Sequence, residues 1–182
     1  MTACFFARSA VLLFSLGLAL YYDLKETRIK NFITLPAALT GLALNVYEGG
    51  ITGLQLSLKG WLIPILALLI LYRINVMGAG DIKLFAAIGA IMGLPFTVYC
   101  FMFSVYIGGL ISVGLLWKRK QFKRRMLQVL NYVKFILVTK QIPVYVSAGD
   151  TGSKFIFSAA IVPGAIVQFL LAASWPDQIY RW

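Results

Sequence analysis

The chain alternates between long apolar runs and shorter polar, mostly basic links. Apolar runs of about 17–25 residues are typical of transmembrane helices, and shorter runs are accommodated where a protein thins the bilayer. We predict a span for each of six runs, at about Cys4–Tyr22, Phe32–Tyr47, Leu54–Tyr72, Asp81–Leu94, Phe96–Trp117 and Phe155–Ala173. The pattern therefore predicts an all-α polytopic membrane protein with a single domain over residues 1–182.

Turn-forming residues separate several of these runs. Glu48-Gly49-Gly50 predicts a turn between the second and third spans, and Gly93-Leu94-Pro95 predicts another between the fourth and fifth. The first run reaches Tyr21-Tyr22-Asp23 without a small-residue cleavage motif. We therefore interpret it as a retained span and not as a removable signal peptide.

The link between the fifth and sixth spans, Lys118–Lys154, has its own periodicity. Six basic residues crowd its start, within Lys118–Arg125. Apolar residues then recur at helical spacing, which favours a basic amphipathic helix on the membrane surface over a plain basic loop that only sets topology. These apolar positions are Phe122, Met126, Val129, Leu130, Val133, Ile136 and Leu137.

The basic residues also predict the orientation in the membrane. Six spans place both termini on one side, and 14 of the 17 basic residues fall in or beside links 1–2, 3–4 and 5–6. Because basic residues accumulate on the cytoplasmic side, these links are predicted to be cytoplasmic and both termini outside. The three exceptions are Arg8, Lys59 and Arg181.

Composition supports a membrane protein and narrows its chemistry. Hydrophobic residues make up 60% of the 182 positions and charged residues only 13%, which is too little polar surface for a water-soluble globule. The net charge of +11 lies in the links, so we expect contact with anionic lipid at Lys118–Arg125 and no nucleic-acid partner. With no histidine and two unpaired cysteines, Cys4 and Cys100, we expect no metal site, disulfide or cofactor.

Two carboxylates remain as candidates for catalysis. Of the six acidic residues, Asp23 and Asp81 alone are predicted where helix ends meet cytoplasmic water, two spans apart and therefore on the same face. A carboxylate at the edge of an apolar segment is costly, and this makes it a functional candidate. Two carboxyl groups at one depth can share a proton, so that the ionised one activates a water and the protonated one polarises a peptide carbonyl.

Each aspartate also has a purely structural interpretation. Asp81 follows a glycine turn and is a favoured residue for the N-cap of the fourth helix. Asp23 could be an ordinary interface residue near Lys25 or Arg28. We expect Gly78 and Gly80, which flank Asp81 without a Cβ, to let a substrate backbone approach and to permit positive φ. Taken jointly, the matching depth and the glycines favour the functional interpretation.

Residues 78–84, Gly-Ala-Gly-Asp-Ile-Lys-Leu, resemble the GxGDxKL signature of the prepilin peptidase family. That family belongs to the GxGD class of intramembrane aspartic proteases. Residues 23–31, followed by Thr34-Leu35-Pro36, are similar to the family's first-aspartate motif, although Lys30 stands where the family usually has proline. The sixth span is faintly similar to the family's last helix, so the resemblance covers essentially the whole chain. It implies that the catalytic pair is Asp23 and Asp81.

The resemblance also implies which form of the enzyme this is. The large cytoplasmic insertion of bifunctional members, with its zinc motifs and methyltransferase role, is absent because Asp23 and Asn31 are joined directly. The chain is therefore similar to short, peptidase-only members. Lys83 either snorkels at the helix start or acts on Asp81 or a substrate carboxylate. Asn31 either caps the second helix or orients backbone or substrate, and we favour the cap.

These observations predict an aspartic endopeptidase of a prokaryotic cytoplasmic (inner) membrane. It would cleave the leader from type IV prepilin or pseudopilin proteins at the cytoplasmic face, as implied by the resemblance. A small proton-coupled transporter that uses the same carboxylates as a relay is one alternative, although both aspartates lie at the membrane edge and not near its middle. A non-catalytic assembly scaffold is a second alternative.

Overall fold

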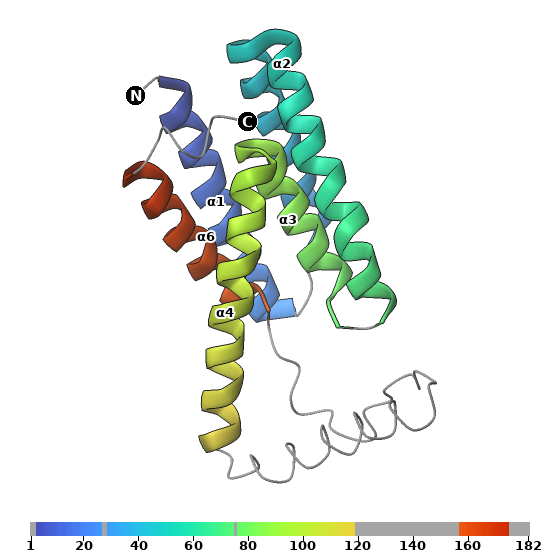
Figure 1. Cartoon of the computed structure of the whole chain (residues 1–182), viewed down its shortest axis with the longest axis vertical. Helices are drawn as coiled ribbons and strands as arrows, with labels where there is room; N and C mark the ends of the chain where they lie inside the picture. The colour runs from blue at the N-terminus through green and yellow to red at the C-terminus, as the bar shows by residue number, and fades with distance from the viewer. Residues whose placement is uncertain (1–2, 27–28, 75, 119–156, 175–182) are drawn as a thin grey trace. The chain divides into compact units, whose positions relative to one another are not determined.

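The computed structural model describes residues 3–26, 29–74, 76–118 and 157–174, and all of its regular structure there is helical (Figure 1). The helices are α1 (Ala3–Glu26), α2 (Asn31–Arg73), α3 (Ala79–Met92), α4 (Leu94–Lys118) and α6 (Ser158–Ser174). The all-α prediction is confirmed for this part of the chain. The surface helix predicted after Lys118 lies outside the described residues.

Residue contacts divide the chain into two compact units, residues 1–107 with 156–182, and residues 108–155. The first unit contains α1, α2, α3, α6 and the start of α4, and it holds every feature described below. The single domain over residues 1–182 stays a prediction.

Three of the described helices are long and apolar enough to cross a bilayer, which confirms an integral membrane protein. The candidate segments are Phe6–Glu26, Asn31–Arg73 and Leu94–Leu115. α6 is shorter, and α3 has only 14 residues, or about 21 Å at 1.5 Å per residue. The helix lengths alone therefore do not establish six spans, and the number of spans stays a prediction.

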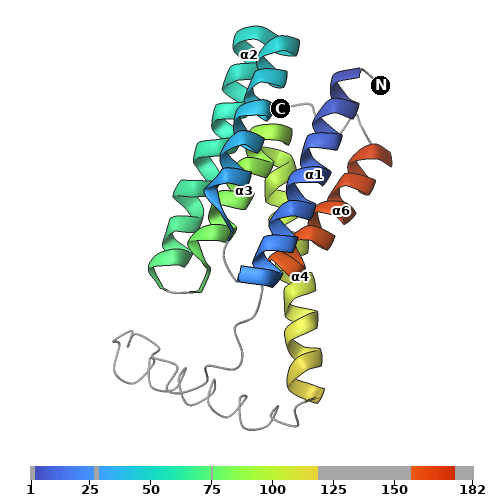
Figure 2. The same ribbon diagram turned by 180° about the vertical axis from the view of Figure 1, so that it is seen from behind.

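The long helix α2 is bent at Gly50, where φ is 55° and ψ is −127°. This backbone conformation is accessible to glycine and strained for other residues. The bend falls at the turn expected from Glu48-Gly49-Gly50 and divides α2 into a first limb, residues 31–49, and a second limb, residues 51–73. The two limbs correspond to the second and third predicted spans, and both run beside α3 (Figures 1 and 2).

The short helix α3 forms the centre of the first unit. Ten of its residues, Ile82 and Leu84–Met92, are buried. This burial agrees with its sequence, which is apolar on nearly all faces of the helix. The second limb of α2 approaches it so closely that a Cβ at Gly60 would lie 2.0 Å from the carbonyl oxygen of Gly89. Small residues that let backbones meet are typical of helix contacts in membranes.

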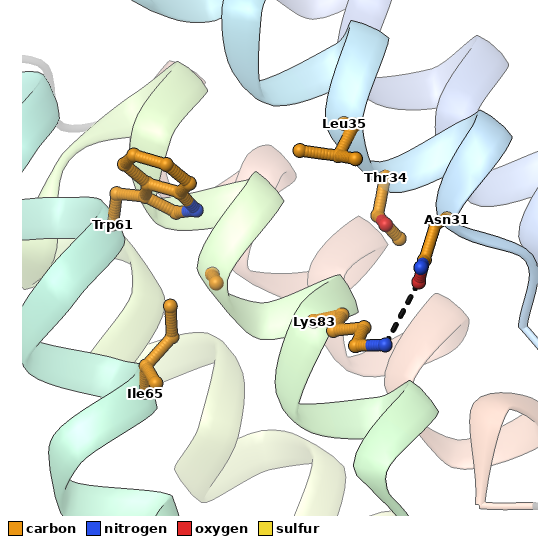
Figure 3. Close-up of a pocket in the computed structure, with 7 residues that line it drawn as sticks. Asn31, Thr34, Leu35, Trp61, Ile65 and Lys83 are labelled. Carbon is orange, nitrogen blue, oxygen red and sulfur yellow. Dashed lines mark hydrogen bonds between the residues drawn. The ribbon is translucent and has the colours of Figure 1, made fainter.

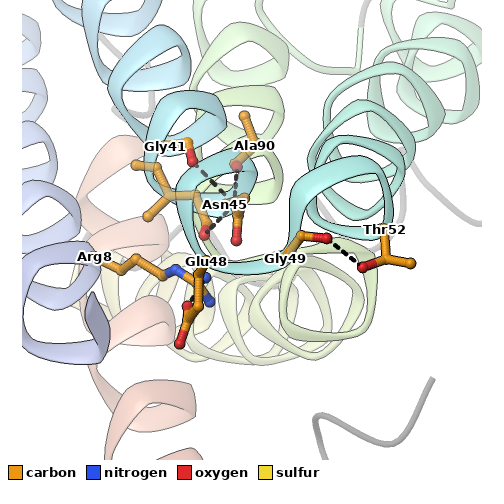
Figure 4. Close-up of polar contacts among 8 residues, drawn as sticks. Arg8, Gly41, Asn45, Glu48, Gly49, Thr52 and Ala90 are labelled. Atoms are coloured by element: carbon orange, nitrogen blue, oxygen red, sulfur yellow. Dashed lines mark hydrogen bonds and ion pairs between the residues drawn. The ribbon is translucent and has the colours of Figure 1, made fainter. Parts of the chain in front are cut away.

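The C-terminal end of α3 is capped by both limbs of α2, and Figure 4 shows the contact of Asn45 from the first limb. The Asn45 side-chain amide donates to the carbonyls of Ala90 and Ile91, at 2.9 and 3.1 Å. The Ser57 hydroxyl donates to the Ala90 carbonyl at 2.7 Å. Both side chains are buried. The last carbonyls of a helix lack intrahelical partners, and in an apolar layer each unsatisfied one is costly, so these bonds allow α3 to end where it does.

Candidate active site

Asp23 lies in the last turn of α1 and is only 8% exposed. We predicted a first span that ends at about Tyr22, with Asp23 at the cytoplasmic end of the helix and at the start of the polar link. The helix instead continues to Glu26, because Leu24, Lys25 and Glu26 are good helix formers and no glycine or proline interrupts them. The correction matters because a helical Asp23 has a fixed orientation.

Asp81 lies in the first turn of α3, three residues after the N-cap residue Gly78. Its carboxylate accepts a hydrogen bond from the Gly78 backbone N–H. An acidic side chain that reaches back to the N-cap N–H is the second half of a capping box, and its negative charge is favourable at a helix N-terminus. Asp81 is thus not the N-cap itself, which was the structural alternative, but it does help to close the helix end.

The charges of Asp23 and Asp81 act on each other across the contact between α1 and α3. Asp23 is buried and Asp81 is half-buried, so little water screens this repulsion. Two segments 58 positions apart in the sequence thus bring their carboxyl groups within electrostatic range of each other. Their roles in catalysis stay a prediction.

The two glycines beside Asp81 do not have the conformation we expected. Gly78 is extended, with φ of −75°, and Gly80 is helical, whereas the positive-φ glycines of the described residues are Gly50 and Gly93. Gly80 has a packing role instead: a Cβ there would lie 3.1 Å from Cβ of Ile29. This close contact sets the link between α1 and α2 against the start of α3. Sequence reasoning missed Ile29, although it is a lone buried apolar residue in a basic link.

The link is also fastened at its polar side. The Lys30 ammonium pairs with Glu26 at 2.9 Å and lies 4.7 Å from the ring centre of Tyr22. Such exposed pairs add little to stability, but here they join the end of α1 to the residue that precedes α2. At position 30, where the prepilin peptidase family usually has proline, the contacts of Lys30 with Glu26 and Tyr22 therefore hold the start of α2 in place.

Asn31 and Lys83 are joined to each other. The Lys83 ammonium donates to Oδ1 of Asn31 at 2.8 Å, which ties α3 to the start of α2 (Figure 3). The favoured interpretation of Asn31 as a helix cap is wrong, because the N-cap of α2 is Lys30 and makes no side-chain cap bond. Within the described part of the chain, Lys83 donates a hydrogen bond to this amide and makes no ion pair with Asp81.

A pocket of roughly 230 Å³ opens beside this bond, between α3 and the two limbs of α2 (Figure 3). Lys83 is two residues after Asp81, about 200° around a helix of 3.6 residues per turn, so the pocket lies on a different face of α3 from Asp81. Its lining is mainly apolar, with the Lys83 and Asn31 head groups at one side. The lining residues are Asn31, Thr34, Leu35, Trp61, Ile65, Lys83 and Ala86.

The chain is similar in sequence to known leader peptidases. The sequence pattern of the type IV leader peptidase family matches residues 10–113, a range that includes both aspartates. The chain is also similar to the prepilin leader peptidase/N-methyltransferase of Vibrio cholerae serotype O1, with 33% identity over 92 residues. That alignment covers 47% of this chain and 36% of the relative, so the chain matches only about a third of the relative's length.

No solved structure matches the chain. The sequence matches favour the peptidase prediction over the transporter and scaffold alternatives, and they agree with the resemblance seen in residues 78–84. Because the family pattern extends over more than half of the chain, the chain belongs to the type IV leader peptidase family.

Proposed function

We propose that this protein is an intramembrane aspartic endopeptidase in which Asp23 and Asp81 act as a pair. The observation that carries the proposal is the meeting of these two carboxyl groups, from the end of α1 and the start of α3, within electrostatic reach of each other. Membership of a leader peptidase family supports peptide-bond cleavage as the chemistry. The proposed substrates are prepilin or pseudopilin proteins, with a short basic leader followed by an apolar segment.

The pair would work by sharing one proton. Repulsion between the two carboxylates favours the singly protonated state. The ionised carboxylate takes a proton from water as the oxygen attacks the scissile carbonyl, and the protonated partner donates a hydrogen bond to that carbonyl oxygen. The resulting tetrahedral intermediate collapses when a proton passes from the pair to the leaving amine. The apparent pKa values belong to the pair and not to either residue.

The surrounding contacts hold the pair in place. The Gly78 N–H orients the Asp81 carboxylate, and the packing of Gly80 against Ile29 fixes the distance between the α1–α2 link and α3. The bond from Lys83 to Asn31 fastens α3 to α2 on the neighbouring face. Because Asp23 and Asn31 are joined by a short link, we propose peptidase activity without the methyltransferase function named in the Vibrio relative.

We also propose a six-span arrangement in a prokaryotic inner membrane, with the pair at the cytoplasmic face and both termini outside. The ion pair between Arg8 and Glu48 supports the parity of the first spans, because it joins the N-terminal part of α1 to the bend of α2, at the end of α1 remote from Asp23 (Figure 4). Both residues were predicted on the outer side. Anionic lipid at Lys118–Arg125 is proposed from charge alone.

The proposal is tested with protein reconstituted in liposomes and a prepilin substrate. Asp23→Asn and Asp81→Asn, measured separately, are each expected to reduce cleavage by at least about a hundredfold, the scale of general acid–base contributions. The matched control is Glu26→Gln, which neutralises an exposed carboxylate in the same turn of α1 and is expected to cleave normally. Normal cleavage by either asparagine variant would show that the pair is not the catalytic machinery.

A further inference from the structure

An apolar groove of roughly 410 Å³ runs between α1 and the first limb of α2. Its lining extends along α1 from Val11 to Tyr22, about 16 Å at 1.5 Å per residue, and along α2 from Phe32 to Thr40. The groove is separate from the pocket beside Lys83, with which it shares no lining residue. The catalytic proposal does not use it.

One end of the groove adjoins the candidate active site. Tyr22 directly precedes Asp23, and Phe32 directly follows Asn31. We therefore expect the residues that follow a scissile bond at the aspartates to meet this end of the groove first. From there the groove continues toward Val11 and Thr40, which lie in the middle parts of their helices.

The shape of the groove suits a polypeptide. Its floor contains the buried small residues Ser15 and Ala37, which let a backbone come close, while Phe14 forms part of its wall and is 71% exposed. Pro36, also in the lining, has no N–H to donate to the carbonyl of Phe32. The carbonyl of Phe32 therefore lacks its regular helical donor.

We propose that this groove binds the apolar segment of the substrate that follows the cleavage site. This inference rests on the proposed peptidase function and specifies where its substrate docks. The occupant is a peptide and not a lipid chain, because the groove ends one residue before Asp23 along α1, where the scissile bond of the substrate is proposed to lie. The groove then contributes the binding affinity for long substrates, and Asp23 and Asp81 carry out the hydrolysis.

The test compares two synthetic substrates in detergent micelles. The long one carries a basic leader, a glycine at the cut and about 20 apolar residues, the length that spans a bilayer. The short one ends a few residues after the cut. Thr40→Trp fills the groove, and Leu39→Trp is its matched control, because Leu39 is the neighbouring residue, is 61% exposed and lies outside the lining.

Thr40→Trp is expected to lower kcat/KM for the long substrate at least about tenfold more than for the short one, mainly through KM. Leu39→Trp is expected to affect neither substrate. Equal losses with both substrates, no loss with the long one, or the same loss from Leu39→Trp would each overturn the groove assignment. Such results leave the catalytic pair intact as long as unmodified protein cleaves the short peptide.

A second measurement does not depend on turnover. In an Asp81→Asn background, Thr40→Cys is expected to form a disulfide with a cysteine in the apolar segment of the long substrate, whereas Leu39→Cys is not. Crosslinking that is equal at both positions would show that the segment merely shares the bilayer with the protein. Capture by neither position would place the segment elsewhere.

Discussion

The cap at the end of α3 allows a prediction of magnitude. In Asn45→Ala, the carbonyl of Ile91 loses its side-chain donor, while the carbonyl of Ala90 keeps the bond from Ser57. An unsatisfied buried carbonyl costs about 1–3 kcal/mol in proteins generally, and interhelical side-chain bonds in membranes average about 0.6 kcal/mol. The variant also removes the Oδ1 atom of Asn45, which is buried without a partner, and this offsets part of the loss. We expect a net destabilisation of about 1–2 kcal/mol.

Ser57→Ala should cost less, because Ala90 still receives the bond from Asn45. The double variant leaves both carbonyls without a side-chain donor, so its cost should exceed the sum of the single costs. The assay is equilibrium unfolding in mixed micelles, with helix content and Trp fluorescence as independent probes. If Ser57→Ala costs as much as Asn45→Ala, or if the two costs simply add, the shared-acceptor account of this cap is wrong.

Three further predictions concern the contacts around α3. Gly60→Ala places a Cβ 2.0 Å from the Gly89 carbonyl oxygen, so the helices must separate, and we expect a loss of at least about 1–3 kcal/mol in the same unfolding assay, against no loss if the contact is looser. Gly80→Ala should lower kcat/KM for cleavage while the free energy of unfolding changes little, because it displaces the link near the aspartates. A purely structural effect would lower kcat/KM and the free energy of unfolding in parallel. Lys83→Met should reduce kcat only modestly, and Lys83→Gln, which can still donate to Asn31, should restore it; equal defects would argue for a role of the positive charge.

Much of the fold follows from the hydrophobic pattern. The predicted fifth span, Phe96–Trp117, compares with Leu94–Lys118 for α4, and the predicted turn at Glu48-Gly49-Gly50 falls at the bend of α2. Helix ends were less predictable, because an apolar run indicates where lipid contact stops and not where backbone hydrogen bonding stops. For this reason α1 extends beyond Tyr22 to Glu26.

The sequence predicts the residue types of the proposed site but not the contacts that surround them. The motif around Asp81 and the parity of the predicted spans indicate that Asp23, in the last turn of α1, and Asp81, in the first turn of α3, lie on the same side. The packing of Gly80 against Ile29 and the bond between Lys83 and Asn31 depend on how the helices approach each other. Such approach distances are set by side-chain volumes in three helices at once, which a one-dimensional pattern does not contain.

The most direct test of the central claim is a double-mutant cycle on cleavage of a prepilin by Asp23→Asn, Asp81→Asn and the double variant. If the two carboxyl groups act as one unit, each single variant should lose nearly all activity and the double variant should be scarcely worse. Substantial cleavage by either single variant, or losses that multiply independently in the double variant, would contradict the account.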